Sequence, residues 1–269
     1  MPARYPERIV CLTEETTETL YLLGEERRIV GISGYTVRPP RARHEKPRVS
    51  AFLSARNEKI LALEPDLVIG FSDLQADILR DLAKAGLNVL VFNQRSVEEI
   101  LSMILTLASI VGAAERGRAL IAELERGLGE IRSAAAALKQ RPRVYFEEWD
   151  APMISGIRWV SELVEIAGGI DVFSEQSRSH AASGRIVADP ARVVEKAPDL
   201  MLASWCGKKF RPERVRERPG FSEVPAVKHG ELHEIKAAEI LQPGPAALTD
   251  GVRRIHEIVA GWSRGVERR

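Results

Sequence analysis

The run from Ala113 to Leu138 constrains the fold of this chain most strongly, because it contains many strong helix formers and no proline. Its apolar residues recur at helical spacing: Leu120, Ile121, Leu124, Leu128 and Ile131. This spacing predicts one long helix with an apolar stripe. At about 1.5 Å per residue, about 25 residues span roughly 37 Å, the size of a small domain. Such a helix either joins two domains or crosses over within one large α/β domain.

Segments on the two sides of this helix repeat the same pattern. Residues Lys59 to Ile69 and Arg192 to Leu202 both read as a helix, then Pro-Asp, then an apolar strand. Each half also opens with an apolar strand followed by two glutamates, Glu14-Glu15 and Glu147-Glu148. Strands that are apolar on both faces and alternate with helices indicate a parallel sheet covered by helices. The repeat therefore predicts an α/β protein of two Rossmann-like lobes with parallel sheets, residues 1–112 and 141–269, joined by a long helix over residues 113–140.

Charge and composition exclude several classes of partner. The chain has 269 residues, enough for two cores, and its 39 basic and 38 acidic residues nearly cancel. We therefore expect no nucleic-acid partner and no attraction to an anionic membrane. No secretory leader and no apolar run of about 18 residues is visible, which predicts a cytoplasmic protein as written, or a periplasmic one if a leader was removed. We expect a monomer.

Common catalytic motifs are absent from the sequence. It contains no phosphate-binding Gly-rich loop, no Gly-x-Ser-x-Gly and no His-Glu-x-x-His. His229 and His233 have the spacing of a helical metal pair, but Gly230 lies between them, so we predict surface histidines and no metal site. The glutamate pairs at strand ends are more typical of helix caps than of general acids. We predict no catalytic residue and no catalytic cofactor.

Candidate ligand contacts follow the predicted strands, where ligands of open α/β sheets bind. They combine aromatic faces with hydrogen-bonding groups, which favours a large, flat and partly apolar ligand. The alternative for each aromatic residue is ordinary core packing. The candidates are Thr13, Glu14, Tyr35, Phe52, Phe71, Ser72, Asn93, Gln94, Trp149, Trp159, Trp205 and Gln242.

Two basic runs, Arg38 to Arg48 and Lys208 to Arg218, accompany these candidates. The second alternates with Glu213 and Glu217, so we expect it to form a solvated face. The functional alternative for both runs is recognition of an anionic phosphate or carboxylate, for which the arginine fork is suited.

Several segments resemble a known family, the helical-backbone (class III) periplasmic substrate-binding proteins of ABC importers, and most of all its cobalamin-binding members. The segments are Arg8 to Glu15, Ile29 to Ser33, Lys59 to Gly70, the long helix, Ile154 to Leu163 and Ala167 to Gly169. The resemblance implies a non-enzymatic protein that binds cobalamin between two lobes, or, as the near alternative, a ferric siderophore or haem.

The same resemblance implies roles for individual residues. Tyr35, Phe52, Phe71 and Trp205 would contact the ring, and Tyr35 is the candidate ligand for a haem iron. Asp77 and Glu213 would dock to an importer permease. Several positions that carry Trp in cobalamin binders carry Phe or Asn here. The alternative of another class is a cytoplasmic enzyme acting on a corrinoid or related cofactor through Glu14, Glu148 or Cys206.

Overall fold

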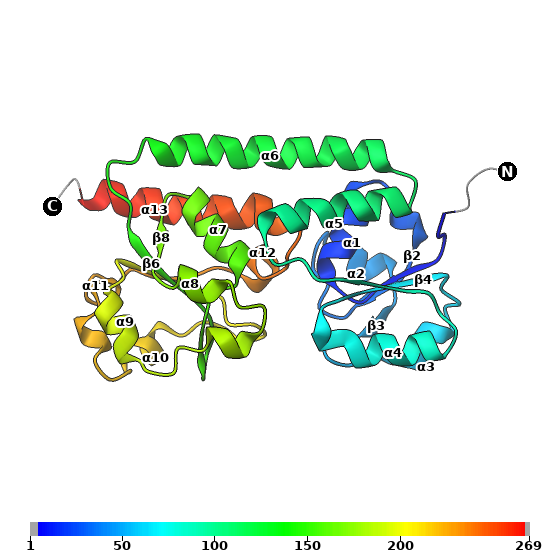
Figure 1. The fold of residues 1–269 in the computed structure, drawn as a ribbon, viewed down its shortest axis with the longest axis horizontal. Helices are drawn as coiled ribbons and strands as arrows, with labels where there is room; N and C mark the ends of the chain where they lie inside the picture. The colour runs from blue at the N-terminus through cyan, green and yellow to red at the C-terminus, as the bar shows by residue number, and fades with distance from the viewer. Residues whose placement is uncertain (1–4, 267–269) are drawn as a thin grey trace. The chain divides into compact units, whose positions relative to one another are not determined.

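The computed structural model describes residues 5–266, which form two compact α/β units. Unit 1 comprises the chain up to Gln94 together with Glu98–Glu123, and unit 2 comprises Arg95–Val97 and the chain from Leu124 onward. The long helix α6 (Ala114–Ala136) contributes residues to both units (Figure 1). The predicted long helix and the predicted α/β class are confirmed. The three-part division at residues 112 and 140 stays a prediction.

Unit 1 contains a five-stranded parallel sheet in the order β3-β2-β1-β4-β5. This order is that of a Rossmann-type half, as predicted for the first lobe. Because all neighbouring strands are parallel, their carboxyl ends lie at one edge of the sheet. The strands are β1 (Ile9–Cys11), β2 (Ile29–Ser33), β3 (Arg48–Ser50), β4 (Leu67–Phe71) and β5 (Val89–Phe92).

Helices and short 3₁₀ turns connect these strands. They are α1 (Glu14–Leu22), η1 (Glu26–Arg28), α2 (Ala42–Glu45), α3 (Asn57–Leu61), η2 (Asp73–Gln75), α4 (Ala76–Lys84) and α5 (Val97–Ile110). Apolar side chains of β1, β3, β4, α3 and α4 form one buried cluster, which includes Val10, Val68 and Leu82. Burial of such side chains is worth about 1.5–3 kcal/mol each, so this cluster fixes the helices against the sheet.

Unit 2 contains a second sheet in the order β10-β9-β6-β7, with β8 paired to β6. Its strands are β6 (Arg143–Asp150), β7 (Met153–Ser155), β8 (Ile170–Asp171), β9 (Leu200–Ala203) and β10 (Leu232–Glu234). The pairings of β6 with β8 and β9, and of β9 with β10, are parallel as predicted. The pairing of β6 with β7 is antiparallel. Only residues 151 and 152 connect these two strands, and so short a connection permits a hairpin but no parallel crossover.

The helical elements of unit 2 follow the same alternation. They are α7 (Arg158–Ile166), α8 (Ser174–Ser177), η3 (Ala182–Arg185), α9 (Ala191–Lys196), α10 (Pro212–Arg216), η4 (Phe221–Glu223), α11 (Pro225–Lys228), α12 (Ala237–Ile240), the π-turn η5 (Ala247–Gly251) and α13 (Val252–Val266). No helix within the described residues 5–266 is long and apolar enough to cross a membrane.

The Pro-Asp repeat performs the same structural task in both units. The Asp66 carboxylate accepts backbone N–H groups of Glu7 and Arg8, at 2.7 and 3.0 Å, where β1 begins. The Asp199 carboxylate accepts the N–H of Arg143, at 2.8 Å, where β6 begins. Each repeat therefore fastens the end of a helix to the start of the first strand of its unit.

Two arginines complete the repeated arrangement. Arg8 Nε donates to the carbonyl of Leu63 at 3.1 Å, and Arg143 Nε donates to that of Lys196 at 2.9 Å. Leu63 lies just after α3 and Lys196 ends α9. Cations and hydrogen-bond donors are favourable at the carboxyl end of a helix. The sequence repeat is thus a repeat of hydrogen bonds.

The apolar stripe of α6 faces protein as predicted. Leu124 and Leu128 are buried, whereas Leu120, Ile121 and Ile131 are half-buried. Gly117 lies so close to Ala108 of α5 that a β-carbon would overlap the alanine methyl group. Close contact between α5 and α6 within unit 1 therefore requires this glycine.

Candidate ligand-binding surfaces

Three exposed apolar side chains lie in the segments that follow β2, β3 and β4 at the carboxyl edge of the unit 1 sheet. Tyr35 comes after β2, Leu53 after β3 and Leu74 after β4, and their exposed fractions are 56%, 68% and 57%. We call these three residues the apolar rim. Exposed apolar groups at the carboxyl ends of parallel strands are typical of a binding surface.

The sequence predicted Tyr35 but missed Leu53 and Leu74. Phe52 and Ser72, their predicted neighbours, are half-buried and buried, respectively. The available signal was a leucine three positions after a strand end. That signal is weak because isolated exposed leucines are common on protein surfaces.

A buried acidic group lies at the start of α1, directly after β1. Glu14 and Glu15 are 7% and 1% exposed, and the hydroxyl of Thr13 donates to Glu15 Oε1 at 2.7 Å. Burial, reinforced by the charge of Glu15, raises the pKa of Glu14 to about 8. Burial likewise raises the pKa of Glu15 to about 7, against the hydrogen bond from Thr13. Near neutral pH Glu14 therefore holds its proton for most of the time, whereas Glu15, which accepts the Thr13 hydrogen bond, is about half ionised.

The backbone changes direction sharply after β4. Phe71 is 6% exposed, and Ser72 is buried with φ of +57°, a conformation that non-glycine residues rarely adopt. Ser72 Oγ accepts the N–H of Leu74 at 3.2 Å, which stabilises the turn. A residue in this backbone conformation costs about 1–3 kcal/mol of strain, which the surrounding structure must offset. Residues strained in this way are concentrated at functional sites.

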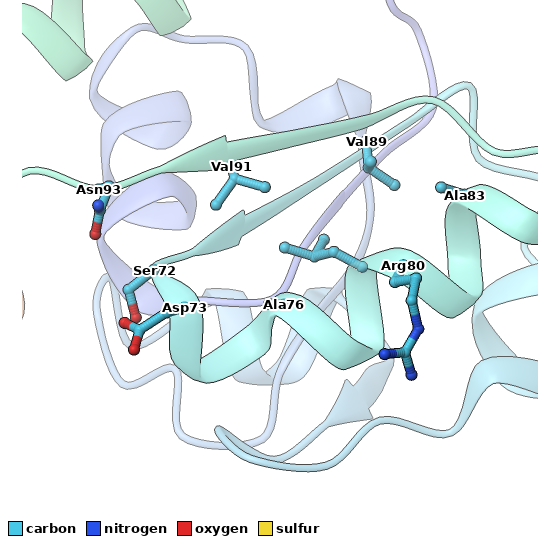
Figure 2. A pocket seen from close by; sticks show the side chains of 9 residues that line it. Ser72, Asp73, Ala76, Arg80, Ala83, Val89, Val91 and Asn93 are labelled. Atoms are coloured by element: carbon cyan, nitrogen blue, oxygen red, sulfur yellow. The ribbon is translucent and has the colours of Figure 1, made fainter.

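A groove of about 360 Å³ runs between α4 and β5 of unit 1 (Figure 2). Ser72, Asp73 and Asn93 lie at one end of this groove and Arg80 lies toward the other, with Val89 and Val91 on the strand side. The groove includes two predicted ligand residues, Ser72 and Asn93. Gln94, the next predicted residue, is buried.

The strand ends of unit 2 carry a different set of groups. The carboxylate of Glu147, in β6, is fully buried and accepts two hydrogen bonds from Arg218, at 2.6 and 2.9 Å. The Tyr145 hydroxyl and Trp205 Nε1 each donate to the same carboxylate at 2.9 Å. This buried charge is therefore fully paired.

A second ionic cluster caps two tryptophan rings. Asp150 forms ion pairs with Lys208 and, at 2.9 Å, with Arg214. The Lys208 ammonium lies 3.9 Å from the centre of the Trp149 ring and 5.4 Å from that of Trp205. Burial opposes ionisation of Asp150, but the hydrogen bond from Lys208 and the two positive charges hold its pKa below the ordinary value.

The expectation that Lys208 to Arg218 forms a solvated face holds for Lys209, Arg211, Arg214 and Arg216, which are exposed, whereas Lys208 and Arg218 are half-buried. Lys208, Arg214 and Arg218 all pair with carboxylates of β6, because the loop after β9 folds back over the end of that strand. The alternation with Glu213 and Glu217 concealed this role, since the true partners are distant in sequence.

The three tryptophans predicted as ligand contacts lie in or near the core. Trp205 is 3% exposed and packs edge-on against Phe210, at 5.0 Å between ring centres. Trp159 is also 3% exposed, and its Nε1 donates to the carbonyl of Ile240 at 2.9 Å. Trp149 is half-buried and donates to the carbonyl of Ala151. Of these three, Trp149 presents the most ring surface to solvent.

The residues named for other roles are dispersed. Gln242 is half-buried in the turn before η5, and Glu148 pairs with the buried Arg185 at 2.5 Å. The Cys206 thiol is exposed on the loop after β9. His229 ends α11 and His233 lies in β10, with Nε2 2.9 Å from Glu231. Residues 5–266 contain no group of three or more His, Cys, Asp or Glu side chains arranged to hold a metal ion.

Comparisons with known proteins agree with this fold. The sequence matches the family described as periplasmic binding protein over residues 9–239. The vitamin B12-binding protein of Vibrio cholerae is 29% identical over 254 residues, which cover 93% of this chain and 87% of that protein. YvrC of Bacillus subtilis, named as an uncharacterized ABC transporter substrate-binding lipoprotein, is 24% identical over 263 residues, covering 94% of this chain and 80% of YvrC.

A solved structure shows the same architecture. The periplasmic haem-binding protein RhuT from Roseiflexus superposes with a TM-score of 0.79 at 24% identity, covering 94% of this chain and 99% of that one. These matches confirm the predicted resemblance and the prediction of a binding protein in place of an enzyme. The chain belongs to the periplasmic binding protein family.

Proposed function

We propose that this protein binds cobalamin as the substrate-binding component of an ABC-type uptake system. The observation that carries the proposal is the apolar rim, three exposed side chains that follow β2, β3 and β4 at the carboxyl edge of one parallel sheet. The named relatives, a vitamin B12-binding protein and an ABC transporter substrate-binding lipoprotein, support it. The family supports a periplasmic site of action over a cytoplasmic one.

The chemistry of a corrinoid suits the strand-end surface of unit 1. Its macrocycle presents a broad apolar face, which the side chains of Tyr35, Leu53 and Leu74 complement. Its rim carries amide groups that both donate and accept hydrogen bonds. At the carboxyl edge of the unit 1 sheet, the carboxyl group of Glu14 holds its proton near neutral pH and can donate to such an amide.

A haem-binding function is the second candidate, and one observation favours it. The Tyr35 side chain is 56% exposed at the apolar rim, and a tyrosine phenolate is an established ligand for haem iron. Tyr35 would serve either ligand, as a ring contact for cobalamin or as an axial ligand for haem.

Absorbance titrations separate the two candidates. We expect saturable changes in the visible spectrum of cyanocobalamin with the wild-type protein and with Tyr35→Phe, because the phenyl ring retains the contact. Haem binding through Tyr35 would instead give an absorbance band that Tyr35→Phe abolishes. If the absorbance spectrum changes on addition of haem but not on addition of cyanocobalamin, haem is the ligand and the cobalamin proposal is refuted.

We further propose that α4 and α10 dock to the importer permease. Asp77 lies on α4 with its side chain 85% exposed, paired with Arg80 at 2.6 Å, and Glu213 is exposed on α10. Exposed carboxylates of this kind set the rate and orientation of docking to a basic surface. Asp77→Lys combined with Glu213→Lys should abolish stimulation of the transporter ATPase while cobalamin affinity stays unchanged. Stimulation equal to that by wild type would refute this docking assignment.

A further inference from the structure

One fully buried side chain connects three of the strand ends that carry the unit 1 surface. Gln75 ends the turn η2 and is 0% exposed. Its Nε2 donates to the carbonyl of Phe52 at 3.0 Å and to that of Leu12 at 3.3 Å. Its Oε1 accepts the N–H of Phe71 at 2.9 Å. Both amide hydrogens and the amide oxygen are therefore in use.

The three partners come from separate parts of the sheet. Leu12 follows β1, Phe52 follows β3 and Phe71 ends β4. The ends of β1 and β4 are paired directly, but β3 is separated from β1 by β2, so no ladder pairing links the loop after β3 to the other two segments. The bonds from one amide hold the three chain segments at fixed mutual positions.

Two neighbouring residues adapt the chain to this arrangement. Ser72, in its left-handed conformation, accepts the backbone N–H of Gln75 with its carbonyl at 3.3 Å and thereby forms the turn that directs Gln75 inward. A β-carbon on Gly70 would lie 3.0 Å from Gln75 Oε1 and 2.8 Å from Leu79. Glycine at position 70 of β4 therefore leaves space for the Gln75 side-chain amide, with which a larger residue would clash.

Two members of the apolar rim are adjacent to these bonds. Leu53 is the next residue after Phe52, and Leu74 is the residue before Gln75. The loop that carries Leu53 is closed locally by a bond from the Ala51 N–H to the Ser54 carbonyl at 2.7 Å. Gln75 is what connects this closed loop to the ends of β1 and β4.

We propose that Gln75 is a positioning residue for ligand binding, which fixes Leu53 and Leu74 in the geometry that fits the ligand without touching the ligand itself. This inference rests on the proposed function, because it assigns the unit 1 rim to cobalamin. A buried amide suits the task because it offers two donors and an acceptor without introducing charge. No other uncharged side chain of this size presents that combination.

The test uses Gln75→Leu, which keeps the approximate size but removes all three bonds. We expect cyanocobalamin affinity to fall at least tenfold and amide hydrogen exchange to accelerate at residues 51–54 and 71–74. Gln75→Glu is the second variant, because a carboxylate still accepts from Phe71 but repels the carbonyl oxygens of Leu12 and Phe52. It should accelerate exchange at residues 51–54 more than at residues 71–74.

Leu82→Ala is the matched control. Leu82 is 0% exposed in the same cluster of unit 1, so its truncation lowers stability without changing a rim bond. Below its unfolding temperature this variant should bind as wild type does. Equal losses of affinity in Gln75→Leu and Leu82→Ala would overturn the proposal, as would wild-type affinity in both Gln75 variants.

The hydrogen-exchange result keeps this inference distinct from the proposed function. If wild-type protein does not bind cyanocobalamin, the proposed function fails, but faster exchange confined to residues 51–54 and 71–74 in Gln75→Leu still supports positioning of the rim. Unchanged exchange at those residues in both Gln75 variants overturns it. If Gln75→Leu does not fold, the exchange pattern and affinity of Gln75→Glu decide the question in the same way.

Discussion

The strand-end surfaces of the two units differ in what they expose. In unit 1, Tyr35, Leu53 and Leu74 project apolar groups into solvent, while two carboxyl groups with raised pKa values lie buried at the start of α1. In unit 2, Trp205 is buried and the accessible groups are cations paired with Asp150. The same repeated α/β frame thus supports one apolar surface and one ionic surface.

This difference indicates that unit 1 contributes more to binding energy and that unit 2 contributes more to rigidity. Exposed apolar side chains gain free energy when a ligand covers them, at roughly 25 cal/mol per Å² of apolar surface. Buried charges that are already paired gain little on binding, but they hold the loop after β9 of unit 2 against β6. We therefore expect substitutions in unit 1 to alter affinity and substitutions in unit 2 to alter stability.

The largest expected effect is on the stability of unit 2. Glu147→Gln removes the negative charge that pairs with Arg218 and that accepts hydrogen bonds from Tyr145 and Trp205. The largely buried guanidinium of Arg218 is then left without a compensating charge. Breaking a buried pair in this way costs roughly 3–5 kcal/mol. We expect a loss of that size in the free energy of unfolding measured with urea.

The control for this prediction is Glu257→Gln. Glu257 pairs with Arg254 at 3.2 Å on the exposed face of α13, and such pairs contribute about 0–1 kcal/mol. A Glu147→Gln loss no larger than that of the control would show that the network of unit 2 is not rigidly paired.

The next effect should appear in affinity, with stability unchanged. Replacing Tyr35, Leu53 and Leu74 together by Ser should weaken cyanocobalamin binding about a hundredfold, or about 2.8 kcal/mol. Because all three side chains are exposed, each replacement should change the free energy of unfolding by no more than about 0.5 kcal/mol. Calorimetric titration and urea unfolding measure the two quantities.

Leu22→Ser provides the matched substitution. Leu22 is 54% exposed in unit 1, but it lies at the last residue of α1, and the end of β1 precedes the first residue of that helix. It should leave affinity unchanged. A triple variant with wild-type affinity would refute the assignment of the rim as the apolar binding surface.

The sequence predicted much of this organisation but little of the difference between the surfaces. The long helix and the Pro-Asp repeat were predictable because periodicity and local caps are encoded in neighbouring residues. The burial of Trp205 depends on Glu147, which lies 58 positions earlier, and on Arg218 from the loop beyond. Contacts between residues so far apart in the sequence leave no local pattern. The sequence therefore indicated which residues follow strands, but not which of their side chains are buried or paired.

The exposure of Leu53 and Leu74 was hidden for a related reason. Whether a leucine after a strand is core or surface depends on how the next helix packs, which in unit 1 is set by Gln75 and Gly70. The aromatic residues attracted the prediction because of their type, but Phe71 and Trp159 are in fact buried. Residue type alone could not rank these candidates.

A smaller effect is a pH dependence of opposite sign in the two units. Glu14 and Glu15 have pKa values of about 8 and 7 in the folded protein, above the ordinary value near 4.5. The folded state therefore holds protons that the unfolded state releases. Their contribution to stability is fully present below about pH 4.5 and is lost as pH rises through 7 to 8, by at most about 1.4 kcal/mol per pH unit for one group.

Asp150 of unit 2 should behave oppositely. Its folded-state pKa is lowered, so its contribution is present at neutral pH and is lost as pH falls through the folded-state value. Urea unfolding from about pH 2 to 8.5 should show that Glu14→Gln flattens the fall in stability toward alkaline pH and that Asp150→Asn flattens the fall below about pH 4. Identical profiles for wild type and Glu14→Gln would contradict the assignment for unit 1.

The smallest effect concerns the cap over the tryptophans of unit 2. Lys208→Met removes a cation–π contact with Trp149 and one ion pair of Asp150. We expect a loss of about 0.5–1 kcal/mol in unfolding free energy and stronger quenching of tryptophan fluorescence by acrylamide. Lys209→Met, at the exposed neighbouring position, should change neither measurement. Equal quenching in both variants would show that Lys208 does not cover the rings.

The most direct measurement is isothermal titration calorimetry of the full chain with cyanocobalamin at two temperatures. Burial of the apolar rim predicts saturable binding of one ligand per chain with a negative heat-capacity change. Absence of heat at both temperatures, together with no thermal stabilisation at ligand concentrations far above those of the protein, would contradict the assignment of cobalamin as the ligand.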